Sequence, residues 1–166
     1  APAAAATVDA LAAVVHAGWQ AQPAFADAGG PWRGRQGTLT KHGAEAALAD
    51  VPAALRPALA SWYCAVVSHD RVRALGDHGP VIVEGPLARN AAFVTALSAL
   101  LGDDRPLRRS TDLLEGTARG AARLARWDER HAQAPAFDPP PAVERALSGA
   151  LRRHADDWST RQARST

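Results

Sequence analysis

A run of three β-branched residues, Val81-Ile82-Val83, is the feature of this sequence that most restricts the fold of the chain. Turn-forming residues bound the run on both sides, and a short apolar run of this kind is typical of a buried strand in a parallel sheet. Beyond Gly85, apolar residues recur at helical spacing at Phe93, Leu97 and Leu100. The run ends at the next glycine, Gly102. The segment therefore predicts a strand, a glycine-containing loop and a helix.

A second unit of the same kind follows along the chain. Residues 106–108 form a short extended piece, and a helix of small residues begins near Gly116 and continues to about Ala125. Two consecutive strand-helix units predict an α/β fold in which the connections between parallel strands are right-handed.

Further helices are predicted on either side of these units. Thr7 is a suitable N-cap for an amphipathic helix that ends at Gly18, and a longer helix runs from Pro57 to a stop at Gly76. Residues 135–141 are a proline-rich connector to a last helix, whose apolar stripe predicts that it packs back on the domain. That stripe consists of Val143, Leu147, Leu151, His154 and Trp158.

The stretch between the first two helices is rich in glycine and proline. Residues 23–37 are therefore predicted to be a loop. The alternation at Thr38-Leu39-Thr40 then indicates a short strand.

The composition excludes several classes of protein. A chain of 166 residues, 47% hydrophobic and 22% charged, is long enough for one globular domain. Its apolar runs are far shorter than the roughly 20 residues that cross a bilayer, so no membrane partner is expected. Acidic residues are interleaved with the basic ones and the net charge is only +2, which argues against nucleic-acid binding. The single Cys64 fits a reducing, cytoplasmic setting.

The loop after Val83 is the best candidate for a binding site. In open α/β sheets ligands gather at the carboxyl ends of the strands, where a helix N-terminus attracts phosphate. Gly85 allows the backbone to approach a nucleotide, and Asn90 could reach an adenine or ribose edge. The alternative is a simple tight turn with a solvent-facing Asn90. Gly116 and Gly120 leave a similar choice between a helix that lies close to a ligand and one that is merely closely packed.

No catalytic residue and no metal site are predicted in the chain. Ser68-His69-Asp70 has the residue types of a hydrolase triad, but consecutive residues on a helix point in different directions and cannot converge. The six histidines show no ligand-like pairing with one another or with Cys64, which argues against a structural zinc site.

The order of these motifs resembles the later half of the FGGY family of carbohydrate kinases. Such proteins carry a strand, a glycine turn ending in Ala-Arg-Asn or Ala-Arg-Ser, a helix ending in Leu-Gly, and a short strand that begins near a proline. The corresponding pieces here are residues 81–90, the helix up to Gly102 and the strand after Arg105. Residues 115–122 resemble the family's Gly-Ala-Ala helix, and the tail around Trp158 resembles its closing helix. The resemblance covers most of the chain from about Phe25 onward.

The resemblance implies an actin-like, ribonuclease-H-like α/β domain that is helix-rich and has a partial sheet. Residues 1–166 would be a single, incomplete C-terminal domain on the nucleotide side of a two-domain enzyme, as the absence of methionine also suggests. Its pocket residues would be Gly85, Ala88 and Asn90, with Gly116 and Gly120 nearby.

The reaction implied by the resemblance is transfer of the γ-phosphoryl group of ATP, with Mg²⁺, to a hydroxyl of a sugar or polyol. The missing N-terminal half would bind most of that substrate. An incomplete sheet would expose apolar surface, so the chain is expected to pair with its other half or to form a homodimer.

Three departures from the family pattern bear on this expectation. Pro86 and Leu87 follow Gly85 where the family has further glycines, and proline has no N–H to offer a phosphate. Apolar or small residues replace the Gln and Asp that are common in the next helix. No residue of the chain matches the family's catalytic aspartate, so the isolated chain is predicted to be inactive.

Two other functions remain open on the sequence. A nonenzymatic binding or scaffold domain would have kept the fold and lost the loop glycines. A mature secreted helical domain that begins at Ala1 after removal of a leader would also lack methionine.

Overall fold

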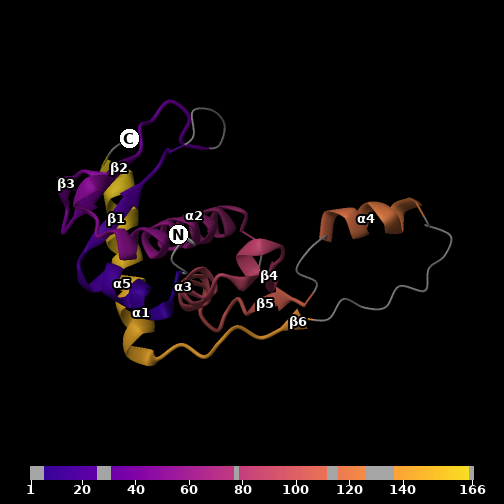
Figure 1. Cartoon of the computed structure of the whole chain (residues 1–166). Helices are drawn as coiled ribbons and strands as arrows, with labels where there is room; N and C mark the ends of the chain where they lie inside the picture. Colours follow the sequence, from indigo (N-terminus) through magenta and orange to yellow (C-terminus); the bar gives the residue numbers. More distant parts are fainter. Residues whose placement is uncertain (1–5, 26–30, 77–78, 112–115, 126–136, 165–166) are drawn as a thin grey trace.

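The computed structural model describes residues 6–25, 31–76, 79–111, 116–125 and 137–164. Within these ranges the chain forms two small sheets, and helices α2 and α3 lie between them (Figure 1). The elements in order are α1 (Val8–His16), β1 (Trp19–Gln22), β2 (Thr38–Lys41), β3 (Ala44–Ala46), the 3-10 turns η1 (Leu48–Asp50) and η2 (Ala53–Leu55), α2 (Arg56–Ala74), β4 (Val81–Val83), the 3-10 turn η3 (Pro86–Arg89), α3 (Ala91–Leu101), β5 (Leu107–Ser110), α4 (Gly116–Ala125), β6 (Phe137–Asp138) and α5 (Arg145–Arg164).

The first sheet is antiparallel, in the order β1-β2-β3. The predicted strand at 38–40 is confirmed as β2, whereas β1 and β3 were not predicted because neither contains a β-branched residue. All four residues of β1 are buried. The edge of β1 away from β2 is covered by α5, where His154 Nε2 donates to Trp19 O at 2.9 Å and Trp158 Nε1 donates to Ala21 O at 2.8 Å. Two side chains of α5 thus donate to β1 carbonyls that would otherwise need a neighbouring strand as hydrogen-bond donor.

The second sheet contains the predicted parallel pair. Strand β4 runs parallel to β5, and α3 is the helix that connects them. The expectation that β4 is fully buried is wrong, because Ile82 is 45% exposed while Val83 is buried. Among the described residues α3 packs against this sheet at β5, and the alternation along β4 places Ile82 on the face opposite to Val83.

The proline-rich connector is more ordered than the sequence predicted. Residues 137–138 of the predicted 135–141 segment form β6, which pairs antiparallel with β5. Arg109 Nε also donates to Pro139 O at 3.2 Å. The chain is therefore held at the sheet edge before it continues to α5, while residues 135 and 136 lie outside the described part.

The predicted helices α1 and α2 are confirmed close to their expected bounds. Thr7 Oγ1 accepts a hydrogen bond from Ala10 N at 3.1 Å, which is the expected N-cap, and α2 ends two residues before Gly76. Along α2 the buried aromatic residue is Trp62, while Tyr63 is half-buried.

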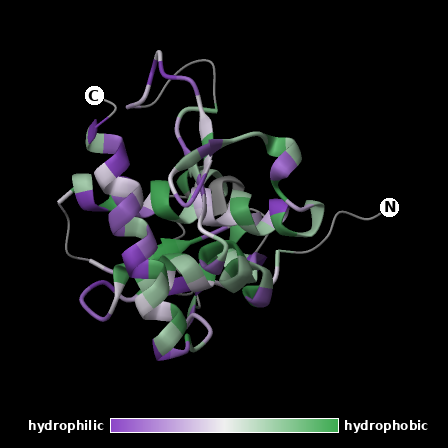
Figure 2. Cartoon of the chain, turned by 90° about the vertical axis from the view of Figure 1, so that its left-hand side faces the viewer, coloured by the Kyte–Doolittle hydropathy of each residue, from purple (hydrophilic) through white to green (hydrophobic). Residues whose placement is uncertain are grey.

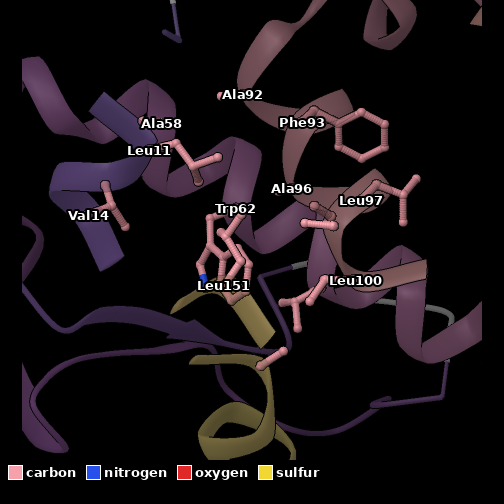
Figure 3. Close-up of a cluster of buried hydrophobic side chains, with 14 of the residues drawn as sticks. Leu11, Val14, Ala58, Trp62, Ala92, Phe93, Ala96, Leu97, Leu100 and Leu151 are labelled. Atoms are coloured by element: carbon pink, nitrogen blue, oxygen red, sulfur yellow. The ribbon is translucent and has the colours of Figure 1, made fainter. Parts of the chain in front are cut away.

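Helices α1, α2, α3 and α5 share one core, in which Leu11, Trp62, Leu97 and Leu151 are among the most deeply buried side chains (Figure 3). Hydrophobic residues gather where the elements meet, and hydrophilic ones lie on the outer side of α5 and along the loops (Figure 2). Burying one of these leucine side chains contributes about 1.5–3 kcal/mol to the free energy of unfolding. The prediction that the last helix packs back on the domain is thus confirmed.

None of the described helices combines the length and the apolar character that a bilayer span requires.

Candidate functional site

Gly85 lies directly beyond the carboxyl end of β4, where the sequence placed the candidate site. Its backbone has φ 71° and ψ −158°, a region that only glycine adopts readily. A Cβ built on Gly85 would meet no heavy atom within 4 Å, so the space beside it is open. The turn therefore requires glycine for its backbone conformation, and it leaves room for a ligand to approach.

Replacing Gly85 by alanine is expected to lower the free energy of unfolding by about 1–3 kcal/mol, because alanine is strained in this backbone region. The matched control is Gly149→Ala in α5, where a Cβ would make an ordinary 3.4 Å contact with a flexible arginine. That change should be neutral or stabilising by up to about 1 kcal/mol. Urea denaturation of both variants measures the difference, and equal effects would contradict the role assigned to the Gly85 backbone.

Ala88 faces the interior. The η3 turn begins at Pro86, whose fixed φ suits a first helical position, and Ala88 N donates to Gly85 O at 3.1 Å. The side chain of Ala88 is buried in the core beside α3. A ligand at this position would therefore meet the backbone of the turn, and the small side chain lets the turn sit close to α3.

Asn90 is the N-cap of α3 and is half-buried. Its Oδ1 accepts from Phe93 N at 3.0 Å, which satisfies a free N–H of the first helical turn. Its Nδ2 donates to Ser61 Oγ on α2 at 2.9 Å. The solvent-facing alternative for Asn90 is therefore wrong, because its amide bonds to two other parts of the protein.

The two glycines of α4 are not next to this loop. Helix α4 stands apart from the other labelled elements (Figure 1). Gly120 is exposed, and a Cβ there would meet no heavy atom within 4 Å, so close packing against this chain does not explain it. Gly116 is the first residue of the same helix. The structure brings Gly85, Ala88 and Asn90 together and leaves Gly116 and Gly120 at a distance.

Two other titratable residues singled out in the sequence, His69 and Cys64, have shifted pKa values in the structure. Asp70 is paired with its neighbour Arg71, and burial together with nearby Arg73 lowers the pKa of His69. Burial raises the pKa of the Cys64 thiol, which disfavours its thiolate form. Among the described residues there is no group of three or more His, Cys, Asp or Glu side chains placed to hold a metal ion.

Ser61 is the residue of this region that the sequence did not reveal. It lies 29 positions before Asn90 and is an ordinary small residue within a helix. Its hydroxyl donates to Pro57 O at 2.8 Å and accepts from Asn90. Only the packing of α2 against α3 brings these two side chains into contact, so no local pattern could have predicted the pair.

A parallel β-α-β unit with a glycine turn after its first strand occurs in several classes of α/β domain, of which the actin-like ATPase domain is one. Comparison with protein families assigns the chain within that class: residues 1–134 match the model of the C-terminal domain of the FGGY carbohydrate kinases. The chain belongs to this family. The match includes the first 24 residues, for which the sequence had suggested no resemblance, and it ends before α5.

The fold is also found in a solved structure. A carbohydrate kinase from Novosphingobium aromaticivorans is similar over 96% of this chain, with a TM-score of 0.70 and 21% sequence identity. The chain spans 31% of the length of that kinase. No curated protein matches the chain. Because the described part of the chain contains two sheets, the helical fold assumed by the secreted-domain alternative is wrong.

Proposed function

We propose that this chain is the nucleotide-binding part of a carbohydrate kinase that transfers the γ-phosphoryl group of ATP to a hydroxyl of a sugar or polyol. The observation that carries this proposal is the Gly85 turn, which in a chain of this family leaves open space at the carboxyl end of a parallel strand. Polypeptide outside this chain would bind most of the sugar or polyol. It would also supply the catalytic base.

The nucleotide would lie against the backbone of the turn from Gly85 to Ala88, with Asn90 holding the turn at the start of α3. Gly116 and Gly120 would approach the nucleotide from another side, although α4 stands apart from the turn in this structure. The segment that carries them leaves the sheet at Ser110 and returns at Phe137, which pair with each other. Because β4 and β5 are parallel, that point lies at the same end of the sheet as Gly85, so the segment is attached near the loop while α4 itself stands apart from it.

Mg²⁺ would be held chiefly by the phosphates of ATP. The described residues offer no cluster of carboxylates for it, and Pro86 has no N–H for a phosphate. This assignment leaves the adenosine part of ATP to the Gly85 turn and the triphosphate to groups elsewhere in the enzyme. The isolated chain would therefore bind nucleotide without turning it over.

The proposal is tested by measuring Mg·ATP binding by calorimetry with the 166-residue chain and with a longer polypeptide that includes the upstream sugar-binding half. Binding by both proteins, and sugar-dependent ATP turnover by the longer one only, is the expected result. No binding by either, together with no turnover by the longer protein, would overturn the proposal.

A nonenzymatic binding or scaffold domain is the second candidate. It is favoured by the loop directly after Gly85, which contains no further glycine. Pro86→Gly separates the two functions. If Pro86 belongs to an adapted kinase loop, glycine should loosen η3 and reduce turnover of the longer protein, because an ordered first position is lost. If the loop is a degenerate remnant, glycine should tighten Mg·ATP binding instead. Steady-state kinetics and calorimetry on the same preparation distinguish these outcomes.

The exposed apolar side chains of Ile82 and Leu87 lie near this loop along the chain. In a complete kinase we expect the other half to cover part of this surface. A homodimer of the isolated chain would cover it as well. Sedimentation of the 166-residue chain distinguishes a monomer from a dimer.

A further inference from the structure

We propose that Ser61 is a positioning residue for the Gly85 loop, a role that deepens the proposed nucleotide-binding function and rests on it. Ser61 lies on α2, on the side that faces α3, and is 4% exposed. Its hydroxyl occupies the middle of a short hydrogen-bonded chain, in which it donates to Pro57 O at 2.8 Å and accepts from Asn90 Nδ2 at 2.9 Å.

The hydrogen bonds continue from Asn90 into the loop. Asn90 N donates to Leu87 O at 3.1 Å, and Ala88 N donates to Gly85 O at 3.1 Å. The position of Asn90 therefore determines where the η3 turn ends, and that turn determines the direction of the Gly85 backbone. Through Asn90, the hydroxyl of Ser61 connects this loop to the long helix α2.

The connection is separate from the capping of α3. Asn90 Oδ1 caps the helix, whereas Asn90 Nδ2 makes the contact with Ser61. Serine is about as good an N-cap as asparagine, but its shorter side chain has no amide to reach across to α2. Asn90→Ser therefore keeps the cap and removes the contact with Ser61, while Ser61→Ala removes the same contact from the other side.

Both variants are expected to act on the loop in the same way. Without the contact, the loop should occupy the binding-competent arrangement for a smaller fraction of the time, and the apparent affinity falls by that fraction. We expect Mg·ATP to bind about tenfold more weakly in each variant. The double variant should be no weaker than either single one, because all three lack one and the same contact.

The test uses the 166-residue chain and two measurements. Amide hydrogen exchange followed by NMR reports on Ala88 and Asn90, whose N–H groups are bonded within the loop. Calorimetry reports on the affinity for Mg·ATP. The control is Ser98→Ala, a serine on α3 away from the loop, which should change neither measurement.

Faster exchange at Ala88 and Asn90 with weaker Mg·ATP binding in both variants supports the proposal. Unchanged exchange, or unchanged affinity despite a lower melting temperature, overturns it, since a residue that only stabilises the fold would lower the melting temperature alone. If the unchanged chain binds no Mg·ATP, the proposed function fails in this chain, and hydrogen exchange still decides whether Ser61 orders the loop. If Ser61→Ala fails to fold, Asn90→Ser decides the question, because it preserves the helix cap.

Discussion

Replacing Trp158 by alanine is expected to lower the free energy of unfolding by about 3–5 kcal/mol, the range typical of large-to-small changes in a core. The Trp158 side chain is 1% exposed, and its ring packs edge-on against Trp32 at a centroid distance of 6.1 Å. Its Nε1 donates at 2.8 Å to Ala21 O, on the edge of β1 that α5 covers. The alanine variant therefore loses packing and leaves a buried carbonyl without its donor.

A matched pair of phenylalanine variants separates these two contributions. Trp62 is also fully buried, but within the described part of the chain its Nε1 has no hydrogen-bond partner. Trp158→Phe and Trp62→Phe remove the same atoms, and only the first removes a hydrogen bond. We expect the loss of stability at Trp158 to be larger by about 1–2 kcal/mol, measured by urea denaturation. Equal losses would show that the bond to Ala21 contributes nothing.

Replacing His154 by alanine is expected to lower the free energy of unfolding by about 2–4 kcal/mol at pH 8. His154 Nε2 lies 2.9 Å from Trp19 O, and Gln20 Nε2 lies 3.3 Å from His154 Nδ1. Since a carbonyl only accepts, Nε2 must carry the proton, and Nδ1 then accepts from Gln20. The variant leaves Trp19 O without this donor and also loses the contact of the ring with Trp62.

The same histidine should make stability depend on pH. Burial is the main cause that lowers the pKa of His154 below its ordinary 6.5, with His42 and Arg161 adding to it, whereas the bond to Trp19 and the charge of Asp157 oppose it. The unfolded chain therefore takes up a proton at a higher pH than the folded chain does. The contribution of neutral His154 is complete above pH 6.5 and is lost as the pH falls from there through the folded-state pKa.

Unfolding curves between pH 5 and 8 measure this dependence. His69 has a lowered pKa as well, so part of the loss should remain when His154 is replaced. The slope of stability against pH should be smaller in His154→Ala than in the unchanged chain. An identical slope in the two proteins would contradict the neutral, buried state of His154.

His154 also explains an arrangement that local sequence rules disfavour, two buried glutamines on one strand. Gln22 Nε2 donates to Gln20 Oε1 at 3.3 Å, and Gln162 Nε2 donates to Gln22 Oε1. Gln162 in turn accepts from Arg35 Nη1 at 3.0 Å. A chain of hydrogen bonds thus runs from Arg35 through Gln162 and the two glutamines of β1 to His154. Both buried glutamines therefore have hydrogen-bond partners.

The helices and the β4-α3-β5 unit could be predicted because their signals are local. Helical spacing from Phe93 to Gly102 and the β-branched run before Gly85 identify one βα unit without any distant partner. The strand β1 could not be predicted in this way, since Trp-Gln-Ala-Gln has no strand pattern of its own. It becomes a strand because β2 pairs with one edge and α5 covers the other.

The same division applies to the candidate site. The sequence by itself determined the family, the parallel pair and the position of Gly85, because backbone conformation and hydrophobic periodicity depend on neighbouring residues. Only the tertiary structure decided that Asn90 bonds to Ser61, that Ile82 is exposed and that α4 stands apart from the loop. Those features depend on contacts between residues that are distant along the chain, and such contacts arise only when the helices and sheets pack together.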